Sequence, residues 1–329
     1  MTARPPERCQ QSLARWRSAV EADLLRRRAA MPGRKPNLRR KKGRIAVVTD
    51  SSCSLPVDRH TQEVLLGQMG ANIVAVPIPV MIGGQMYPET SAELDRDLPL
   101  ALAQGAEVRT SRPSPGRLLE SYQKLKDQGY AGVVSIHLSG ELSGTVDAAR
   151  LAAGQLDFPV TVLDSAQAGL ALGHSVIDAA MTAQLGGTLS AVAESATRTA
   201  RASESLFVLP QLDQLRRGGR INAMATLIGG LLWVKPLLQL VDGEIHPVER
   251  PRTMVRALER LQVRVTEKAH SMQAPRLAVH GFGNDLQALQ LAEALQPLSA
   301  TPIPVVDLPP ALAAHLGLGA LAVSLSPTP

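Results

Sequence analysis

Aromatic side chains are scarce in this chain: two Trp, three Tyr and three Phe make up about 2% of its 329 residues. A large apolar cavity would therefore be lined mainly by aliphatic side chains and Met, and a site that stacks bases or flat cofactors is disfavoured. Cysteine is scarcer still, because only Cys9 and Cys53 occur, and they fit neither a disulfide framework nor a metal site. We expect two free thiols in a reducing compartment, which predicts a cytoplasmic location.

Several common sequence signals are also missing. No run reaches about 18 uninterrupted apolar residues, and the first residues lack the apolar core of a secretory signal. The chain contains no phosphate loop, no Gly-x-Gly-x-x-Gly after a strand and no Gly-x-Ser-x-Gly elbow. No His, Cys and carboxylate group has zinc spacing. We therefore expect no metal, no cofactor and no catalysis by the commonest enzyme motifs.

Positive charge is concentrated at the start of the chain. Residues 1–44 carry 14 Lys and Arg against 3 acidic residues, a net charge of +11, and the remainder carries 21 basic against 26 acidic residues, a net charge of −5. A mildly acidic body would on balance repel phosphate, so nucleic acid is an unfavourable partner for it.

Residues 1–43 are predicted to be a basic N-terminal extension, either disordered or an amphipathic helix. Leu13, Trp16, Val20 and Leu24 are spaced as one stripe of a helix, and arginines surround that stripe. A basic amphipathic helix can make transient contact with an anionic membrane surface, and a solvated arm is the simpler alternative.

The body is predicted to be α/β, with a parallel-sheet α/β domain at residues 44–195 and an α+β domain at residues 196–329. Short β-branched runs alternate with helical patterns in the first part, which is typical of a buried parallel sheet. The second part has fewer strands and helices per residue. Expected strands lie at 44–50, 72–80, 133–137, 160–164, 206–210, 233–240, 276–280 and 321–325, with helices near 116–128, 143–155, 168–185, 189–202, 252–269 and 284–296.

Three polar motifs are candidates for a binding site. Thr110 and Ser111 lie in a polar patch, and Ser143-Gly144 lies in a turn before a helix, where free N–H groups favour an anion. Ser143 as a helix N-cap is the structural alternative. Gly218-Gly219-Arg220 is a glycine-hinged basic turn that can grip a carboxylate. Considered alone, it equally fits a surface turn.

A histidine between glycines precedes the last expected strand, as His315-Leu316-Gly317-Leu318-Gly319. Glycines beside a His allow a ligand to approach it closely. A structural His is the alternative at this position.

Taken together, these segments resemble the DegV family of bacterial fatty-acid-binding proteins over residues 45–326. The motifs occur in family order: Asp50-Ser51, Thr110-Ser111-x-Pro113-Ser114, Leu142-Ser143-Gly144-Thr145, Asp164-Ser165, Leu212-x-x-Leu215-x-x-Gly218-Gly219-Arg220-Ile221, Lys235-Pro236 with Asp242-Gly243, and His315-x-Gly317-x-Gly319. The chain departs from the family pattern at Leu316 and Leu318, where Thr and Pro are usual, and at Cys53 and Ser54, where Ala and Asp are usual.

The resemblance implies a lipid carrier rather than an enzyme. Thr110 and Ser143 would bind the carboxylate of a long-chain fatty acid such as palmitate, with Ser111, Gly144, Arg220 and His315 near the head group. A separate fatty acid kinase would phosphorylate the presented lipid. Burial of about 14 methylenes stabilises the complex by on the order of 11 kcal/mol before binding costs, so the tail should dominate affinity.

Two other functions remain open from the sequence. A serine acyl hydrolase could use Ser143 with His315, although the nucleophile elbow and an orienting carboxylate are missing. The basic N-terminal segment could act as a membrane-binding or nucleic-acid-binding module. Chain-length preference, kinase identity and oligomeric state are not encoded in any motif.

Overall fold

The computed structural model describes residues 5–30, 43–58, 63–220 and 234–329. Its helices are α1 Pro5–Ala29, α2 Ala92–Ala103, α3 Pro115–Asp127, α4 Thr145–Ala153, α5 Gly169–Gln184, α6 Leu189–Arg201, α7 Asp213–Arg217, α8 Met254–Ser271, α9 Asp285–Leu295 and α10 Pro310–Leu316. Short 3-10 helices are η1 Ser51–Cys53, η2 Gly67–Asn72 and η4 Gln296–Leu298. The strands are β1 Ile45–Asp50, β2 Ile73–Val76, β3 Val80–Ile82, β4 Gln85–Tyr87, β5 Val108–Thr110, β6 Gly132–His137, β7 Val160–Asp164, β8 Glu204–Val208, β9 Leu237–Val241, β10 Glu244–Glu249, β11 Arg276–Gly281, β12 Val305–Asp307 and β13 Leu321–Ser326.

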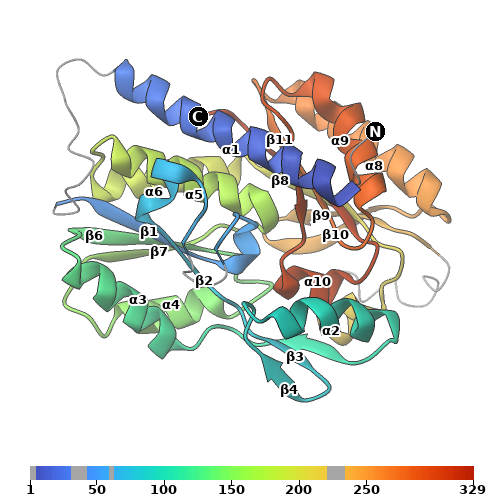
Figure 1. Ribbon diagram of the computed structural model, residues 1–329, viewed down its shortest axis with the longest axis horizontal. Helices are drawn as coiled ribbons and strands as arrows, with labels where there is room; N and C mark the ends of the chain where they lie inside the picture. The colour runs from blue at the N-terminus through green and yellow to red at the C-terminus, as the bar shows by residue number, and fades with distance from the viewer. Residues whose placement is uncertain (1–4, 31–42, 59–62, 221–233) are drawn as a thin grey trace.

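The first half of the body is a four-stranded parallel sheet in the order β2-β1-β6-β7. All six residues of β1 and of β6 are buried, because helices cover both faces of the sheet. Helices α3 and α4 pack on one face, and α5 and α6 pack on the other (Figure 1). The carboxyl ends of β1 and β6 therefore lead their loops to one common edge.

The second half is built on a six-stranded mixed sheet in the order β10-β9-β8-β13-β11-β12. Its neighbouring strands are antiparallel except for the parallel pair β11–β12. Helices α8 and α9 cover one face of this sheet (Figure 1), and α5 contacts β8 and β13. An α/β part is thus followed by an α+β part, which confirms the predicted fold class.

A small third sheet, β4-β3-β5, lies beside α2 and α10. The sequence predicted one strand over 72–80, and this prediction is wrong. The strand is broken at Pro77 and Pro79, because a proline has no N–H to donate to a sheet. The chain between β2 and β3 instead turns from the parallel sheet to the small sheet, which brings Thr110 on β5 toward α10.

Helix α5 joins the two halves, and 15 of its 16 residues are buried. It packs on β1 and β6 on one side and on β8 and β13 on the other. Asp178 on α5 forms a bidentate ion pair with Arg276 on β11, with N···O distances of 2.7 and 2.8 Å. The hydrophobic core is likewise shared, since residues of both halves belong to one buried cluster around α5.

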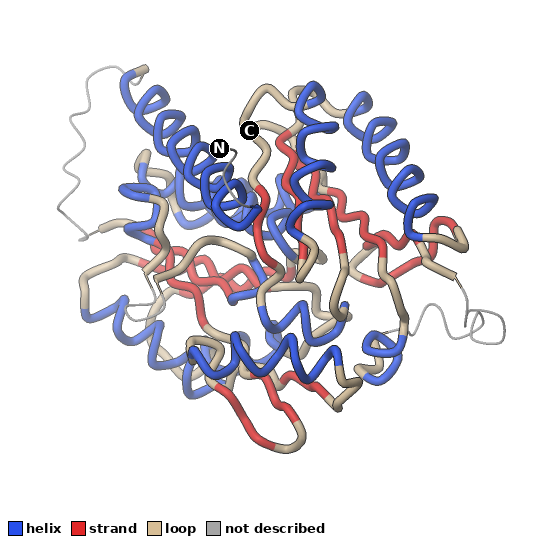
Figure 2. The backbone as a smooth tube through the Cα atoms, turned by 45° about the vertical axis from the view of Figure 1, so that its right-hand side comes forward, coloured by secondary structure: helices blue, strands red, loops and turns tan. Residues whose placement is uncertain are grey.

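Residues 5–29 form one long helix that lies across the body, as the tube in Figure 2 shows. Trp16 and Leu24 are almost fully buried, and Leu13 and Val20 pack against the core. Ser12 accepts a hydrogen bond at 2.9 Å from the backbone N–H of Val305 on β12, which is an edge strand. The apolar stripe that a membrane-binding helix would place in lipid therefore faces the protein.

Parts of three predicted features lie outside the described residues: positions 1–4 and 31–42 of the basic N-terminal extension, Ile221 of the glycine-hinged turn, and Trp233 of the expected strand 233–240. The predicted boundary between residues 195 and 196 falls within α6. Within the described part of the chain, no helix is long and apolar enough to span a membrane.

Candidate functional site

A narrow cavity of about 90 Å³ lies where the first half, the small sheet and the second half meet. Its wall is largely aliphatic, with one aromatic ring from Phe207. The lining residues are Ser52, Ile78, Thr110, Leu138, Leu142, Ser143, Ala168, Gly169, Ser205, Phe207, Leu215, Arg220, Leu240, Ile245, His280, Leu308, Ala311, Leu312, His315, Leu316, Ala322 and Ser324. Four of the residues singled out in the sequence, Thr110, Ser143, Arg220 and His315, therefore line one cavity.

The side chains of Thr110 and His315 contact each other directly. Thr110 Oγ1 and His315 Nε2 share a hydrogen bond of 2.8 Å between β5 and α10, 205 residues apart in sequence. Burial, together with the nearby positive charge of Arg220, lowers the pKa of His315 to about 4. The imidazole is therefore neutral at physiological pH, and it carries one proton for two ring nitrogens.

Arg220 is held against the turn that carries Ser143. Its Nε donates to the carbonyl oxygen of Leu142 at 3.0 Å, and its Nη1 donates to the carbonyl oxygen of Gly218. A guanidinium has five N–H donors, so these two contacts fix its plane and leave donors for a bound anion. Gly218 has ordinary helical backbone angles, yet a Cβ there would overlap His315 Nδ1. A glycine is thus required at position 218 because His315 lies close to the backbone there, and not because of the backbone conformation.

Ser143 lies in the β6–α4 loop, one residue before the helix N-cap. The N-cap is Gly144, so the N-cap alternative for Ser143 is wrong, and Ser143 Oγ instead lies 2.8 Å from Thr145 Oγ1. The β9–β10 hairpin supports the same loop, because Ser139 Oγ donates to the carbonyl oxygen of Gly243 at 2.7 Å. This contact ties the Ser143 turn to the second half of the protein.

Two sequence candidates lie beside the cavity without lining it. Ser111 donates its backbone N–H to the carbonyl oxygen of Pro79 at 3.1 Å, and Gly144 lies under the side chain of Arg112. A Cβ at Gly144 would lie 2.9 Å from Arg112 Nη1. Arg112 is therefore a second cationic group near the cavity, and no sequence pattern favoured it over its neighbours.

The arrangement differs from that of a serine hydrolase. A triad needs the His next to the Ser and an acidic group on the other ring nitrogen. The observed partner of His315 Nε2 is Thr110, and the observed partner of Ser143 is Thr145. His315 Nδ1 is buried with no hydrogen-bond partner among the described residues.

A buried polar network supports the loop after β1, and sequence reasoning did not anticipate it. Asp50 accepts hydrogen bonds from Ser52 and from the backbone N–H of Leu138, and it lies 3.0 Å from His137 Nδ1. The network continues from His137 to Ser135 and Tyr122, with distances of 2.7 and 2.8 Å. Fixed in this way, Ser52 enters the cavity wall.

The comparisons with known proteins agree with this architecture. Residues 44–328 match the DegV family, which is described as uncharacterised. A DegV domain-containing protein of Streptomyces coelicolor is 37% identical over 287 residues, which cover 86% of this chain and 98% of that protein.

Solved structures give the same result. A DegV family protein from Thermus thermophilus, described as binding fatty acid, has a TM-score of 0.74 at 30% identity and covers 87% of this chain and 100% of its own. DegV of Bacillus subtilis, described as a fatty acid binding protein, has a TM-score of 0.75 at 27% identity with the same coverage. Helix α1 precedes the matched region, whereas the cavity and its four predicted residues lie within it. The chain belongs to the DegV family.

Proposed function

We propose that this protein binds a long-chain fatty acid, with the carboxylate at Thr110, Ser143, Arg220 and His315 and the acyl chain along the aliphatic wall. One observation carries the proposal: side chains from four separate segments converge at a single apolar cavity. The relatives from Thermus thermophilus and Bacillus subtilis are described as binding fatty acids, which supports the same ligand class.

The charge of the cluster suits a carboxylate. Arg220 supplies a permanent positive charge, and a neutral His315 that donates from Nε2 would leave the hydroxyl proton of Thr110 free for the ligand. Charge-assisted hydrogen bonds contribute about 1.5–3 kcal/mol each. They would orient the head group, while the buried alkyl chain provides most of the affinity.

The cavity must widen to hold a full acyl chain. Its volume of about 90 Å³ is below the range of about 300–1,000 Å³ that is typical of ligand sites. The side chains around it are mainly Leu, Ile and Ala, and the Leu and Ile side chains can change rotamer to follow a flexible alkyl tail. An acyl chain that enters the cavity would contact these side chains where they now contact one another.

Release of the bound lipid into organic solvent, followed by mass spectrometry, tests the proposal. We expect an acyl species from the purified protein, and uptake of added palmitate after delipidation. Affinity for palmitate should exceed that for hexadecanol, and Arg220→Gln should reduce this difference whereas Arg216→Gln should not. Arg216 is exposed and pairs with Asp213 on the surface. The proposal would be refuted if the purified protein released no lipid and the delipidated protein took up no palmitate.

We further propose that the bound carboxylate is presented to a fatty acid kinase and that the protein has no catalysis of its own. All four head-group residues are only half-buried, so a bound carboxylate would remain within reach of a partner. Incubation of the loaded protein with ATP and a candidate kinase should yield an acyl phosphate. Equal phosphorylation of free fatty acid would contradict the presenting role.

A further inference from the structure

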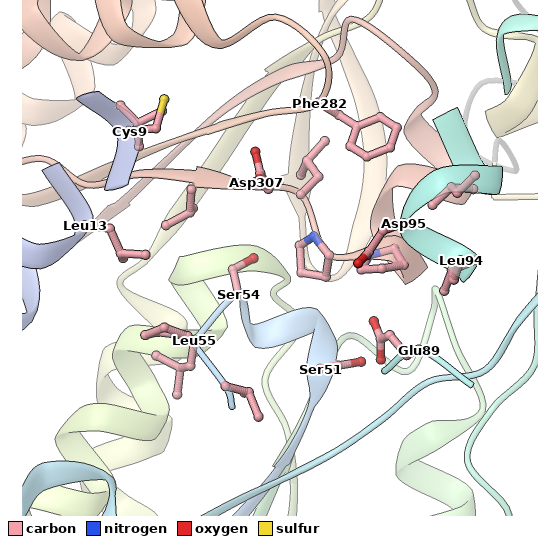
Figure 3. Close-up of a pocket in the computed structure, with 18 of the residues that line it drawn as sticks. Cys9, Leu13, Ser51, Ser54, Leu55, Glu89, Leu94, Asp95, Phe282 and Asp307 are labelled. Carbon is pink, nitrogen blue, oxygen red and sulfur yellow. The ribbon is translucent and has the colours of Figure 1, made fainter. Parts of the chain in front are cut away.

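A second and larger cavity, of about 660 Å³, lies on the other side of η1 and α10 (Figure 3). Its walls come from α1, from the loop around η1, from the start of α2 and from the β12–α10 connection. Ser51 lines this cavity, whereas the adjacent Ser52 lines the narrow one, and Leu308 contributes to both. Because α1 precedes the region matched by the DegV family, one wall of this cavity is built from outside that region.

The charge of the larger cavity is opposite to that of the fatty-acid site. Four acidic residues line it, namely Glu89, Asp95, Asp285 and Asp307, and its described lining contains no Lys, Arg or His. A carboxylate ligand would be repelled by these groups, whereas a cation would be attracted. The remaining lining is mostly aliphatic and proline side chains, which suit an alkyl body.

Two buried oxygen atoms at this cavity have no hydrogen-bond partner within the described ranges of the chain. Ser54 is 7% exposed, and its Oγ is buried with no hydrogen-bond partner among the described residues. Glu89 Oε1 is likewise buried, without a hydrogen-bond partner in the described part of the chain, while Oε2 accepts the backbone N–H of Ile78 at 2.9 Å. In Figure 3 the side chains of Ser54, Glu89 and Asp95 point toward the same space. A buried polar atom without a hydrogen bond is destabilising, so a ligand that donates to it is favoured.

We propose that the larger cavity binds a small aliphatic amine, with its ammonium group hydrogen-bonded by Glu89 and Ser54 and its alkyl chain against Leu13, Leu55 and Leu98. An ammonium group has three donors and no acceptor, which matches a lining of carboxylate and hydroxyl oxygens. Asp307 and Cys9 lie on the opposite side of the space in Figure 3. Asp285 and Asp307 place negative charge at that end too, and burial together with these charges raises the pKa of Cys9 to about 11. A linear diamine should therefore bind more tightly than a monoamine.

Calorimetric titration of the full-length, delipidated protein at about pH 8 tests this site. The probes are 1,5-diaminopentane, pentylamine, 1-pentanol and pentanoate. We expect affinity in the order diamine, monoamine, alcohol, with no binding of pentanoate. Equal affinity for 1-pentanol and pentylamine would overturn the proposal, because it would mean that only the apolar wall is recognised. Absence of binding by both amines at millimolar concentration would overturn it as well.

Matched variants locate the binding. Glu89→Gln keeps the shape of the side chain and removes its charge, and should weaken diamine binding at least tenfold. Glu120→Gln, at an exposed acidic residue on α3, should leave it unchanged. If Glu89→Gln fails to fold, Ser54→Ala takes its place, and unchanged diamine affinity in a folded Ser54→Ala protein would contradict the assigned pocket. Palmitate binding measured in parallel separates failure of this site from failure of the fatty-acid proposal.

Discussion

Replacing Gly218 by Ala should weaken fatty-acid binding without unfolding the protein. The backbone at Gly218 has φ −71° and ψ −11°, which Ala adopts without strain. The added methyl group would lie 3.0 Å from His315 Cε1, which is about 0.5–1 Å inside the optimal carbon–carbon separation of about 3.5–4.0 Å. The imidazole must therefore shift, and its 2.8 Å contact with Thr110 is lost.

The expected magnitude follows from that lost contact. Without His315, the Thr110 hydroxyl is no longer oriented toward the carboxylate, and a hydrogen bond to a charged group contributes about 1.5–3 kcal/mol. The Kd for palmitate should rise by roughly 10- to 150-fold, since each 1.4 kcal/mol is a factor of ten. Displacement of a fluorescent fatty acid measures this change, and urea denaturation measures stability in parallel.

Gly219→Ala is the matched control at the neighbouring position. Gly219 has φ +71°, and a Cβ there would meet no atom of the described residues within 4 Å. Ala in this left-handed conformation costs about 1–2 kcal/mol of stability but leaves the cavity untouched. We expect lower stability with unchanged affinity. The reasoning fails if folded Gly218→Ala binds palmitate like the wild type, or if both variants lose affinity equally.

Three further predictions concern presentation of the lipid to a kinase, the buried ion pair and the pH dependence of stability. Ser143→Ala should weaken palmitate binding by roughly tenfold, because one hydrogen bond to the head group is lost. Phosphorylation of the bound lipid by a kinase should fall by more than that. Equal losses would contradict the idea that the tail provides affinity while the head-group residues orient the carboxylate. Arg276→Met should lower the free energy of unfolding by about 3–5 kcal/mol, because Asp178 is left buried and unpaired, and adding Asp178→Asn should restore part of it; urea unfolding of both variants is the measurement. Burial raises the pKa of Glu89 from 4.5 to about 7, so the folded protein holds this proton more tightly than the unfolded chain. The resulting contribution to the free energy of unfolding is full below about pH 4.5 and is lost as the pH rises through 7. Glu89→Gln should escape this loss, which is roughly 3 to 4 kcal/mol, and parallel pH profiles of the two unfolding free energies would refute the assignment.

The sequence predicted the elements whose residues are buried on both faces. Runs such as Arg44–Asp50 and Val133–His137 are rich in β-branched residues and carry a strong local signal. The sequence did not indicate β5, β12 or α10, because these elements are short and depend on partners distant in the chain. Strand β5, for example, is three residues long and pairs with β3. Local patterns contain little information about such contacts.

The candidate site shows the same division. Short motifs identified Thr110, Ser143, Arg220 and His315, but their meeting in one cavity depends on strand β5 of the small sheet and on α10, neither of which was predicted. Arg112 and Glu89 were missed for a related reason. Their importance comes from the neighbours that pack around them, and an isolated Arg or Glu in a polar loop carries no local signal.

The burial of α5 between the two sheets has a consequence for how a ligand enters. A helix with 15 of 16 residues buried is a common wall, so the two halves cannot swing apart about a hinge without exposing the centre of the core. Access must therefore come from smaller rearrangements of the elements at the cavity mouth, chiefly α10 and the turn around Gly218. The protein should consequently unfold as one cooperative unit, and neither half should fold when expressed alone.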